Sequence, residues 1–133
     1  MAVALTISTK ELERQAKLVF EGKSYKVFLA SNAGTLTGDS TAAQWEAVEV
    51  SGGGYAAVTG SIAAGSYSTV NGRYQMPQIS AAFSATGAGI SYNTLCVKFD
   101  GELYLHSITV ETPSVTLAAG QSKTYLITLI QDD

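Results

Sequence analysis

The sequence predicts an all-β protein: an antiparallel β-sandwich or jelly roll of about seven or eight strands, with one N-terminal α-helix. Two observations carry this prediction. Short β-rich runs recur along residues 23–131 and are separated by turns rich in Gly, Asn, Asp and Ser. Residues 50–97 contain a single charged side chain, Arg73. A β-barrel is the close rival. We expect an N-terminal arm and amphipathic helix at residues 1–22 and a single β-sandwich domain at residues 23–133.

The helix is expected at residues 8–21. Ser8 and Glu11 have the spacing of a capping box, in which each side chain satisfies the backbone N–H of the other residue. Gly22 offers a left-handed residue to end the helix. The predicted apolar stripe consists of Leu12, Ala16, Val19 and Phe20.

The next segments alternate between strands and turns. Tyr25–Ala30 has period two with apolar residues in both sets, which predicts a strand covered on both faces. Residues 31–41 are dense in turn formers and predict a loop, and Trp45–Val50 predicts a strand. Residues 51–54 predict a turn, because glycines adopt positive φ at little cost.

The weakly charged middle predicts further short strands. They are expected at residues 55–63, with a break at Gly60, and at Tyr67–Val70. Pro77 indicates a strand start, an edge or a bulge. Residues 78–84 alternate, with Ile79, Ala81 and Phe83 on one side.

The clearest hairpin signal comes later. Residues 90–99 and 102–109 are β-rich and flank Asp100-Gly101, a dipeptide typical of a type I′ turn. Residues 111–122 contain Pro113 and predict a loop, and Lys123–Gln131 predicts the last strand.

Charge is distributed unevenly along the chain. The formal net charge is −3. Residues 1–26 hold five Lys and Arg against three Glu, whereas residues 27–133 hold three against eight Asp and Glu. An acidic chain without clustered cations does not predict nucleic-acid binding. The mildly basic front either contacts an acidic partner or is a solvated helix face.

The residues that carry enzyme chemistry are sparse. Cys96 is the only cysteine and His106 the only histidine, so neither a disulfide nor a cysteine-based metal set is expected. Glycines 52–54 are followed by no lysine and do not predict a phosphate loop. Asp39 and Asp100 fit turns better than calcium loops. We therefore expect no enzyme, no metal and no cofactor.

No apolar run approaches the length of a membrane span, and no signal peptide is recognisable, so we expect synthesis in a cytoplasm and no membrane partner. The aromatic residues leave an alternative open. They fit sandwich core and edge positions, but Trp45, Tyr55, Tyr67 and Tyr74, if exposed, would form a carbohydrate-binding surface.

Several runs together resemble a known group of proteins. They are Lys26–Ala30, Glu49–Tyr55 with its Gly-Gly-Gly turn, the neutral strands that follow, Val115–Gly120 and Thr124–Ile127. In this order they are similar to the small β-sandwich structural proteins of tailed bacteriophages: capsid cement or decoration proteins, head fibres and tail-fibre-like proteins. The resemblance covers residues 23–131 and transfers no site residues.

The resemblance implies a structural role in the virion, no catalysis and homo-oligomer formation. The leading hypothesis is a capsid cement protein that binds the major capsid protein or neighbouring virion subunits, and a tail-fibre or other tail component is the alternative. It implies a virion location after synthesis in a bacterial host. From this sequence itself we take seven candidate interface residues: Leu12, Arg14, Lys17, Tyr55, Tyr67, Arg73 and Tyr74.

Overall fold

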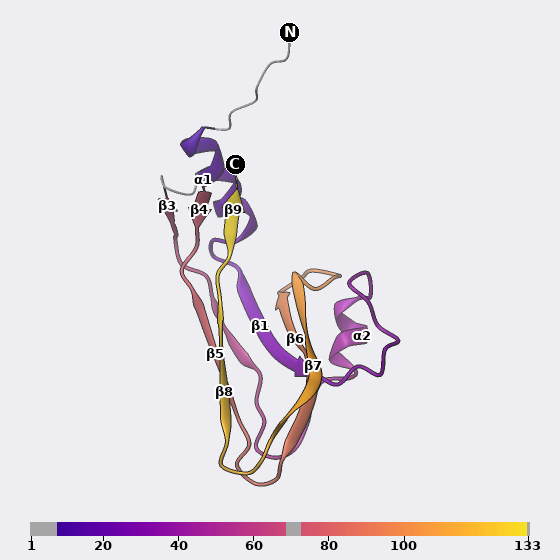
Figure 1. Cartoon of the computed structure of the whole chain (residues 1–133). Helices are drawn as coiled ribbons and strands as arrows, with labels where there is room; N and C mark the ends of the chain where they lie inside the picture. Colours follow the sequence, from indigo (N-terminus) through magenta and orange to yellow (C-terminus); the bar gives the residue numbers. More distant parts are fainter. Residues whose placement is uncertain (1–7, 69–72, 133) are drawn as a thin grey trace. The chain divides into compact units, whose positions relative to one another are not determined.

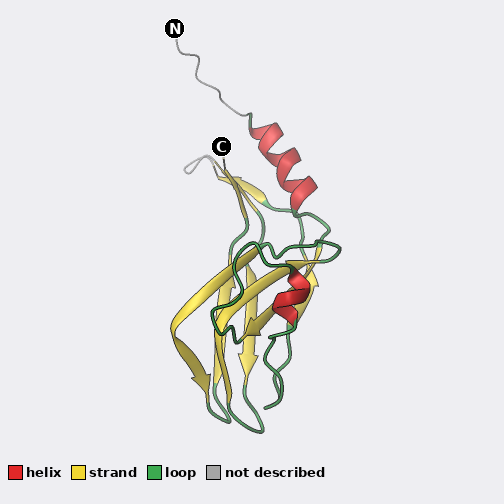
Figure 2. Ribbon diagram, turned by 90° about the vertical axis from the view of Figure 1, so that its right-hand side faces the viewer, coloured by secondary structure: helices red, strands yellow, loops and turns green. Residues whose placement is uncertain are grey.

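The computed structural model describes residues 8–68 and 73–132 and confirms the predicted fold class, a sandwich-like all-β fold (Figures 1 and 2). Its contacts group the chain into two compact units, unit 1 (residues 8–23, 61–79 and 126–132) and unit 2 (residues 24–60 and 80–125). That residues 23–133 fold as one domain without residues 1–22 stays a prediction. The elements are α1 (Thr9–Val19), β1 (Ser24–Ala30), α2 (Ala42–Glu46), β2 (Val58–Ser61), β3 (Ser66–Ser68), β4 (Arg73–Gln75), β5 (Ile79–Ser84), β6 (Ile90–Phe99), β7 (Ser107–Leu117), β8 (Ser122–Ile127) and β9 (Ile130–Asp132).

The helix of unit 1 begins at the predicted Ser8 cap but ends at Val19, two residues earlier than predicted. The Glu11 carboxylate, predicted to complete a capping box, accepts hydrogen bonds from Arg14 and Gln15. The Ser8 hydroxyl accepts a hydrogen bond from the Glu11 backbone N–H at 3.2 Å, and Gly22 follows the helix with φ 76°. Leu12, Ala16 and Phe20 are buried, but Val19 is 46% exposed. The buried stripe is therefore the i, i+4, i+8 row, and the prediction for Val19 was wrong because this residue lies at the flank of that row.

A small sheet forms the rest of unit 1. Its strand order is β3-β4-β9, both pairs are antiparallel, and α1 contacts β4 and β9 (Figure 1). Within the predicted strand Tyr67–Val70, Tyr67 and Ser68 belong to β3, and residues 69 and 70 lie outside the described residues. The buried side chains that complete this unit's core are Ile62, Tyr74, Met76, Ile79 and Leu129.

Unit 2 is built on a four-stranded sheet in the order β2-β1-β6-β7. β1 pairs antiparallel with β6, so that Val27 lies opposite Val97 and Phe28 opposite Cys96. All residues from Val27 to Ala30 are fully buried, which confirms that this strand is covered on both faces.

The predicted strand at Trp45–Val50 was wrong, because α2 occupies the start of this segment. Thr41 and Gln44 form a capping box: the Thr41 hydroxyl accepts from the Gln44 N–H at 3.2 Å, and the Gln44 amide oxygen accepts from the Thr41 N–H at 2.9 Å. This short helix buries Trp45, which packs with Phe28, Ala30 and Cys96. The T-x-x-Q signal was present in the sequence, but the helix is too short to show an apolar period.

Glycines in this part of the chain have two structural roles: some adopt positive φ in a turn, and one allows a side chain to pack close to the backbone. Gly52, Gly53 and Gly54 all have positive φ, which confirms the predicted glycine turn. The strand predicted at residues 55–63 is shorter, since β2 spans Val58–Ser61. The predicted break at Gly60 was wrong, because Gly60 lies inside β2. A Cβ at Gly60 would lie 2.8 Å from Cζ of Tyr25, so this glycine lets an aromatic ring approach the strand closely.

The predicted hairpin partners do pair, but the turn between them differs. β6 and β7 are antiparallel, with Val97 opposite Ser107. Gly101 has φ 81°, whereas no described residue other than glycine has positive φ, so a type I′ turn at Asp100-Gly101 is excluded. The second strand starts at Ser107 because the preceding loop pairs with the segment before α2: the Ala42 N–H donates to the Leu103 carbonyl at 2.8 Å.

The predicted loop at residues 111–122 was wrong over its first part, since β7 continues to Leu117. Between Tyr92 and Thr94 of β6, the partner on β7 changes from Val115 to Val110, so β7 carries extra residues and bulges there. Pro113 lies in that bulge on an edge strand, where a missing N–H is tolerated.

The strand at residues 78–84 is confirmed as β5, in which Ile79, Ala81 and Phe83 are buried and the residues between them exposed. β5 pairs with β8 in a two-stranded sheet. The predicted last strand, Lys123–Gln131, is divided into β8 and β9, which join different sheets. One long strand could not satisfy both pairings, because β4 and β5 belong to separate sheets.

Candidate assembly surface

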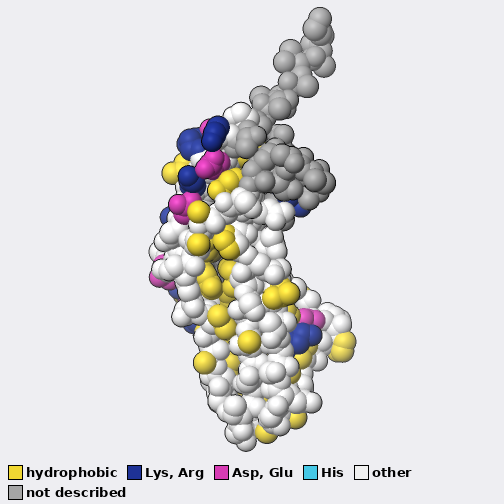
Figure 3. All heavy atoms as spheres, turned by 90° about the vertical axis from the view of Figure 1, so that its left-hand side faces the viewer, with side chains coloured by type: hydrophobic (Ala, Val, Ile, Leu, Met, Phe, Trp, Pro, Cys, Tyr) yellow, Lys and Arg dark blue, Asp and Glu magenta, His cyan; other side chains and the backbone are white. Residues whose placement is uncertain are grey.

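The β5–β8 sheet exposes small neutral side chains on one side. In β5 the buried residues alternate with exposed ones. In β8 Tyr125 faces inward, and because side chains alternate along a strand, the residues on either side of Tyr125 and every second residue from them face outward. We call these exposed residues the outer face; they are Ser80, Ala82, Ser84, Ser122, Thr124 and Leu126, which is 63% exposed. In Figure 3, neutral and hydrophobic side chains cover most of the face in view, and charged side chains form only small groups. A sheet face without charged side chains suits a tight contact with another protein surface.

An aromatic cluster holds the outer face in position from beneath. Phe83 stacks on Tyr55 with ring centroids 6.0 Å apart and meets Tyr125 edge-on at 6.4 Å. Tyr92 of β6 meets Tyr125 at 6.5 Å. These contacts join the two sheets of unit 2, and aromatic pairs of this geometry contribute about 0.5–1.5 kcal/mol each beyond the area they bury.

The tyrosine hydroxyls of this cluster form a chain of hydrogen bonds. The Tyr92 and Tyr125 oxygens are 2.6 Å apart, and the Tyr125 hydroxyl donates to Oε1 of Glu111 at 2.9 Å. Burial raises the pKa of both Tyr92 and Tyr125. Both phenols therefore stay neutral donors at ordinary pH, and the chain satisfies polar groups between the sheets.

Charged residues of unit 2 gather elsewhere, at the junction of β1, β6 and α2. Nζ of Lys98 lies 2.6 Å from Oε1 of Glu46, and Nζ of Lys26 lies 3.3 Å from Oε2 of Glu46 and 2.8 Å from Oε1 of Glu49. The Tyr55 hydroxyl donates to Glu49 at 2.8 Å and accepts from the Leu29 N–H at 3.0 Å. We call these four charged residues and Tyr55 the charge cluster.

The charge cluster ties elements together and does not separate an acid from a base. The hydrogen bond from Lys98 lowers the pKa of Glu46. Burial acts to lower the pKa of Lys26, but its bond to Glu49 and the nearby carboxylates outweigh burial and raise it. Burial also raises the pKa of Tyr55. Glu46, Lys26 and Tyr55 are thus held in their ordinary charge states, whereas acid–base catalysis needs pKa values moved toward neutrality.

The candidate interface residues of unit 1 have different environments. Leu12 and Tyr74 are buried, and the Tyr74 hydroxyl donates to the Gly65 carbonyl at 2.9 Å. Arg14 and Lys17 are exposed on α1, but Arg14 pairs with Glu11 and Lys17 with Glu13. Of these four residues, the two basic ones are exposed and the other two are buried.

The remaining candidate interface residues also do not form a common site. Tyr55 is half-buried in the charge cluster, Arg73 is half-buried in β4, and the side chain of Tyr67 lies outside what the structure describes. Trp45 is 1% exposed, and its indole N–H donates to the Thr37 carbonyl at 3.1 Å. Trp45 and Tyr74 therefore do not offer the exposed rings that the carbohydrate-binding alternative would require of them.

None of the seven candidate interface residues taken from the sequence belongs to the outer face. Its signal was the alternation of residues 78–84, which names the buried set and therefore also the exposed one. The residues between Ile79, Ala81 and Phe83 drew no attention because Ser and Ala carry no recognisable chemistry.

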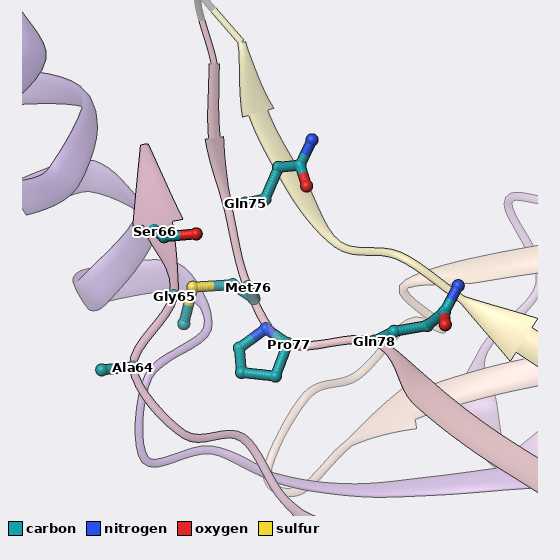
Figure 4. Close-up of a pocket in the computed structure, with 7 residues that line it drawn as sticks. All are labelled: Ala64, Gly65, Ser66, Gln75, Met76, Pro77 and Gln78. Atoms are coloured by element: carbon teal, nitrogen blue, oxygen red, sulfur yellow. The ribbon is translucent and has the colours of Figure 1, made fainter. Parts of the chain in front are cut away.

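A pocket of about 350 Å³ lies in unit 1 between β3 and the end of β4 (Figure 4). It is lined by Ala64, Gly65, Ser66, Gln75, Met76, Pro77 and Gln78, none of them charged. In Figure 4 the two glutamine side chains extend away from the Pro77 ring, so no set of polar groups converges on one point. A ligand site ordinarily has such convergent groups.

Metal and thiol chemistry find no support in the described part of the chain. It holds no group of three or more His, Cys, Asp or Glu placed to bind a metal. Cys96 is fully buried, and burial raises the pKa of its thiol to about 12.

None of the described helices is long and apolar enough to cross a membrane. Comparisons with protein-family models, with curated proteins and with solved structures find no match.

Proposed function

We propose that this chain is a structural protein of a virion, and in particular a capsid cement or decoration protein that binds the major capsid shell. The observation that carries the proposal is the outer face, a solvent-exposed sheet surface of Ser, Thr, Ala and one Leu with no charged residue. The resemblance of residues 23–131 to small phage β-sandwich proteins supports the same role.

A cement protein acts by joining neighbouring subunits. Each contact adds buried area that must be lost before the shell can open, and small neutral side chains allow two surfaces to approach without burying unpaired charge. The aromatic cluster beneath the outer face supplies rigidity, so little ordering entropy is lost on binding.

The proposal is tested by co-sedimentation of the purified chain with capsid shells assembled without it. Ala82→Lys places a charge in the outer face at an exposed position. We expect capsid binding to weaken about tenfold or more, because an unpaired ammonium must be desolvated. The matched control is Thr35→Lys, which adds the same charge at an exposed loop position of unit 2.

Equal binding by Ala82→Lys and wild type would refute the role of the outer face. Wild-type chain that binds no shell, and that imaging of whole particles locates on the tail, would favour the tail-component alternative. A carbohydrate-binding module would instead be retained on a glycan array, and its binding would survive Ala82→Lys.

A further inference from the structure

The edge strand β7 is open along its outer side. It spans Ser107–Leu117, and β6 is the one described strand that hydrogen-bonds to it (Figure 1). At its beginning Ser107 and Thr109 are exposed and Val110 is 62% exposed. An edge strand presents backbone N–H and C=O groups that can pair with another extended strand.

The two halves of β7 differ in how this edge is protected. The second half contains the bulge opposite Tyr92 and Thr94, with Pro113 inside it, and both features hinder pairing with a further strand. The first half, Ser107–Glu111, has no proline and no lysine, and Ile108, Thr109 and Val110 are β-branched residues that favour strands. The second half of β7 is therefore protected against pairing with a further strand, whereas the first half is not.

We propose that the first half of β7 pairs antiparallel with the same segment of a second copy of this chain, across a twofold axis at Thr109. Such an axis stands perpendicular to the sheet and keeps each side chain on its own face. Thr109 then lies opposite Thr109, Ile108 opposite Val110, and Ser107 opposite Glu111.

Charge selects this register. Glu111 is the only charged residue of β7, and a twofold axis at Glu111 would bring two carboxylates face to face. An axis at Thr109 places Glu111 opposite a serine hydroxyl, which can donate to it, and gives a ladder of five residues that excludes Pro113. A β-branched residue also faces a β-branched one at each of the three central positions, which favours cross-strand packing.

This pairing does not depend on the proposed capsid role. A ladder of five residues is small beside a standard protein interface, so we expect weak association that rises with concentration. Many copies held on one surface would strengthen it by raising the effective concentration.

Cysteine cross-linking tests the register. Thr109→Cys places two thiols opposite each other within disulfide reach, so mild oxidation should give a dimer on a non-reducing gel. The matched control is Ser114→Cys, on the same strand but beyond the paired segment, and wild type controls for Cys96, which is buried. Failure of Thr109→Cys to cross-link, or equal cross-linking by Ser114→Cys, would overturn the proposal.

Solution mass tests the contact without cross-linking. We expect wild type to rise toward twice the mass of one chain in light scattering as concentration increases, and Val110→Lys to stay at the mass of one chain. Val110 is exposed, so the thermal unfolding of this variant should match that of wild type. A dimer that persists in Val110→Lys contradicts the pairing. Self-association without capsid binding would contradict only the cement role, and capsid binding by a strictly monomeric wild type would contradict only the pairing.

Discussion

The two sheets that form the sandwich of unit 2 differ in where they carry charged side chains. The four-stranded sheet is covered on both faces along its central strands, at Val27–Ala30 of β1 and residues 94–97 of β6, and it carries Lys26 and Lys98, each paired with a carboxylate near α2. The β5–β8 sheet is buried on one face only, and its outer face has no charged residue.

This difference between the sheets shows that polar residues stabilise the fold in one sheet and form an exposed surface in the other. In the four-stranded sheet, charges fasten α2 to the strands, so they contribute to the fold itself. In the β5–β8 sheet, Ser and Thr keep the outer face hydrated while leaving no charge to desolvate in a contact. Stability should therefore depend on the covered face of the first sheet, and assembly on the exposed face of the second.

The largest effect is expected at the face covered by α2. Trp45→Ala should lower the free energy of unfolding by about 3–5 kcal/mol, because it opens a cavity against Phe28 and Cys96. Urea titration followed by circular dichroism measures the change. Leu103→Ala serves as the control, since Leu103 is 63% exposed, and its effect should stay within about 0.5 kcal/mol. A similar loss of unfolding free energy in the two variants would contradict the prediction that burial of Trp45 under α2 stabilises the fold.

The two faces of β5 can be compared at adjacent positions. Ala81→Leu should destabilise by about 1–3 kcal/mol because Ala81 is fully buried and the added carbons overpack the core. Ala82→Leu adds the same atoms on the outer face and should change the free energy of unfolding by less than about 0.5 kcal/mol. Thermal unfolding of both variants is the measurement, and the reverse order of stabilities would show that the strand faces the other way.

Removing one hydroxyl tests the charge cluster. Tyr55→Phe should cost about 1–2 kcal/mol at neutral pH, because Glu49 and the Leu29 N–H lose a partner. The folded pKa of Tyr55 is raised above its ordinary value of 10.0, so its contribution is present below pH 10 and is lost as pH rises above it.

The difference in unfolding free energy between wild type and Tyr55→Phe should therefore shrink above pH 10. Denaturant titrations at neutral and alkaline pH measure it. A difference that grows with pH would contradict a neutral, hydrogen-bonded phenol.

The smallest effect is expected for one carboxylate. Glu46→Gln should cost about 0.5–1 kcal/mol near neutral pH, since its ion pairs with Lys26 and Lys98 are partly exposed. The folded pKa of Glu46 is lowered from 4.5, so its contribution is present above that pH and is lost as pH falls below it. Urea titration from pH 7 downward measures this loss.

Glu102→Gln, at an exposed loop position, is the control and should follow the wild-type pH profile. A wild-type advantage over Glu46→Gln that increases on acidification would mean that the carboxylate is not stabilised by the lysines.

The sequence predicted the elements whose signal is local. The cap at Ser8, the alternation of β5 and the glycine turn at residues 52–54 depend on residues close in the chain, and all are confirmed. The failures come from distant partners. α2 forms because Trp45 finds a place over β1 and β6, and β7 continues through Pro113 because it is an edge strand.

The candidate site was harder to predict than the fold. The sequence directed attention to aromatic and basic residues, yet Trp45, Tyr74 and Leu12 are buried in cores. A tyrosine has the same identity whether its ring fills a core or faces water, and burial depends on the pairing of strands far apart in sequence. Serine and alanine on an outward face become informative only once the inward face is known.

The composition of unit 1 has a consequence for biosynthesis. Its helix comes from the first residues of the chain, its β3-β4 pair from the middle and β9 from the last described residues. A ribosome releases these segments in that order, so α1 emerges long before the strand that it contacts. The apolar stripe of Leu12, Ala16 and Phe20 thus remains without its full cover until β9 has left the ribosome, so unit 1 can be completed only after all strands of unit 2 have been made.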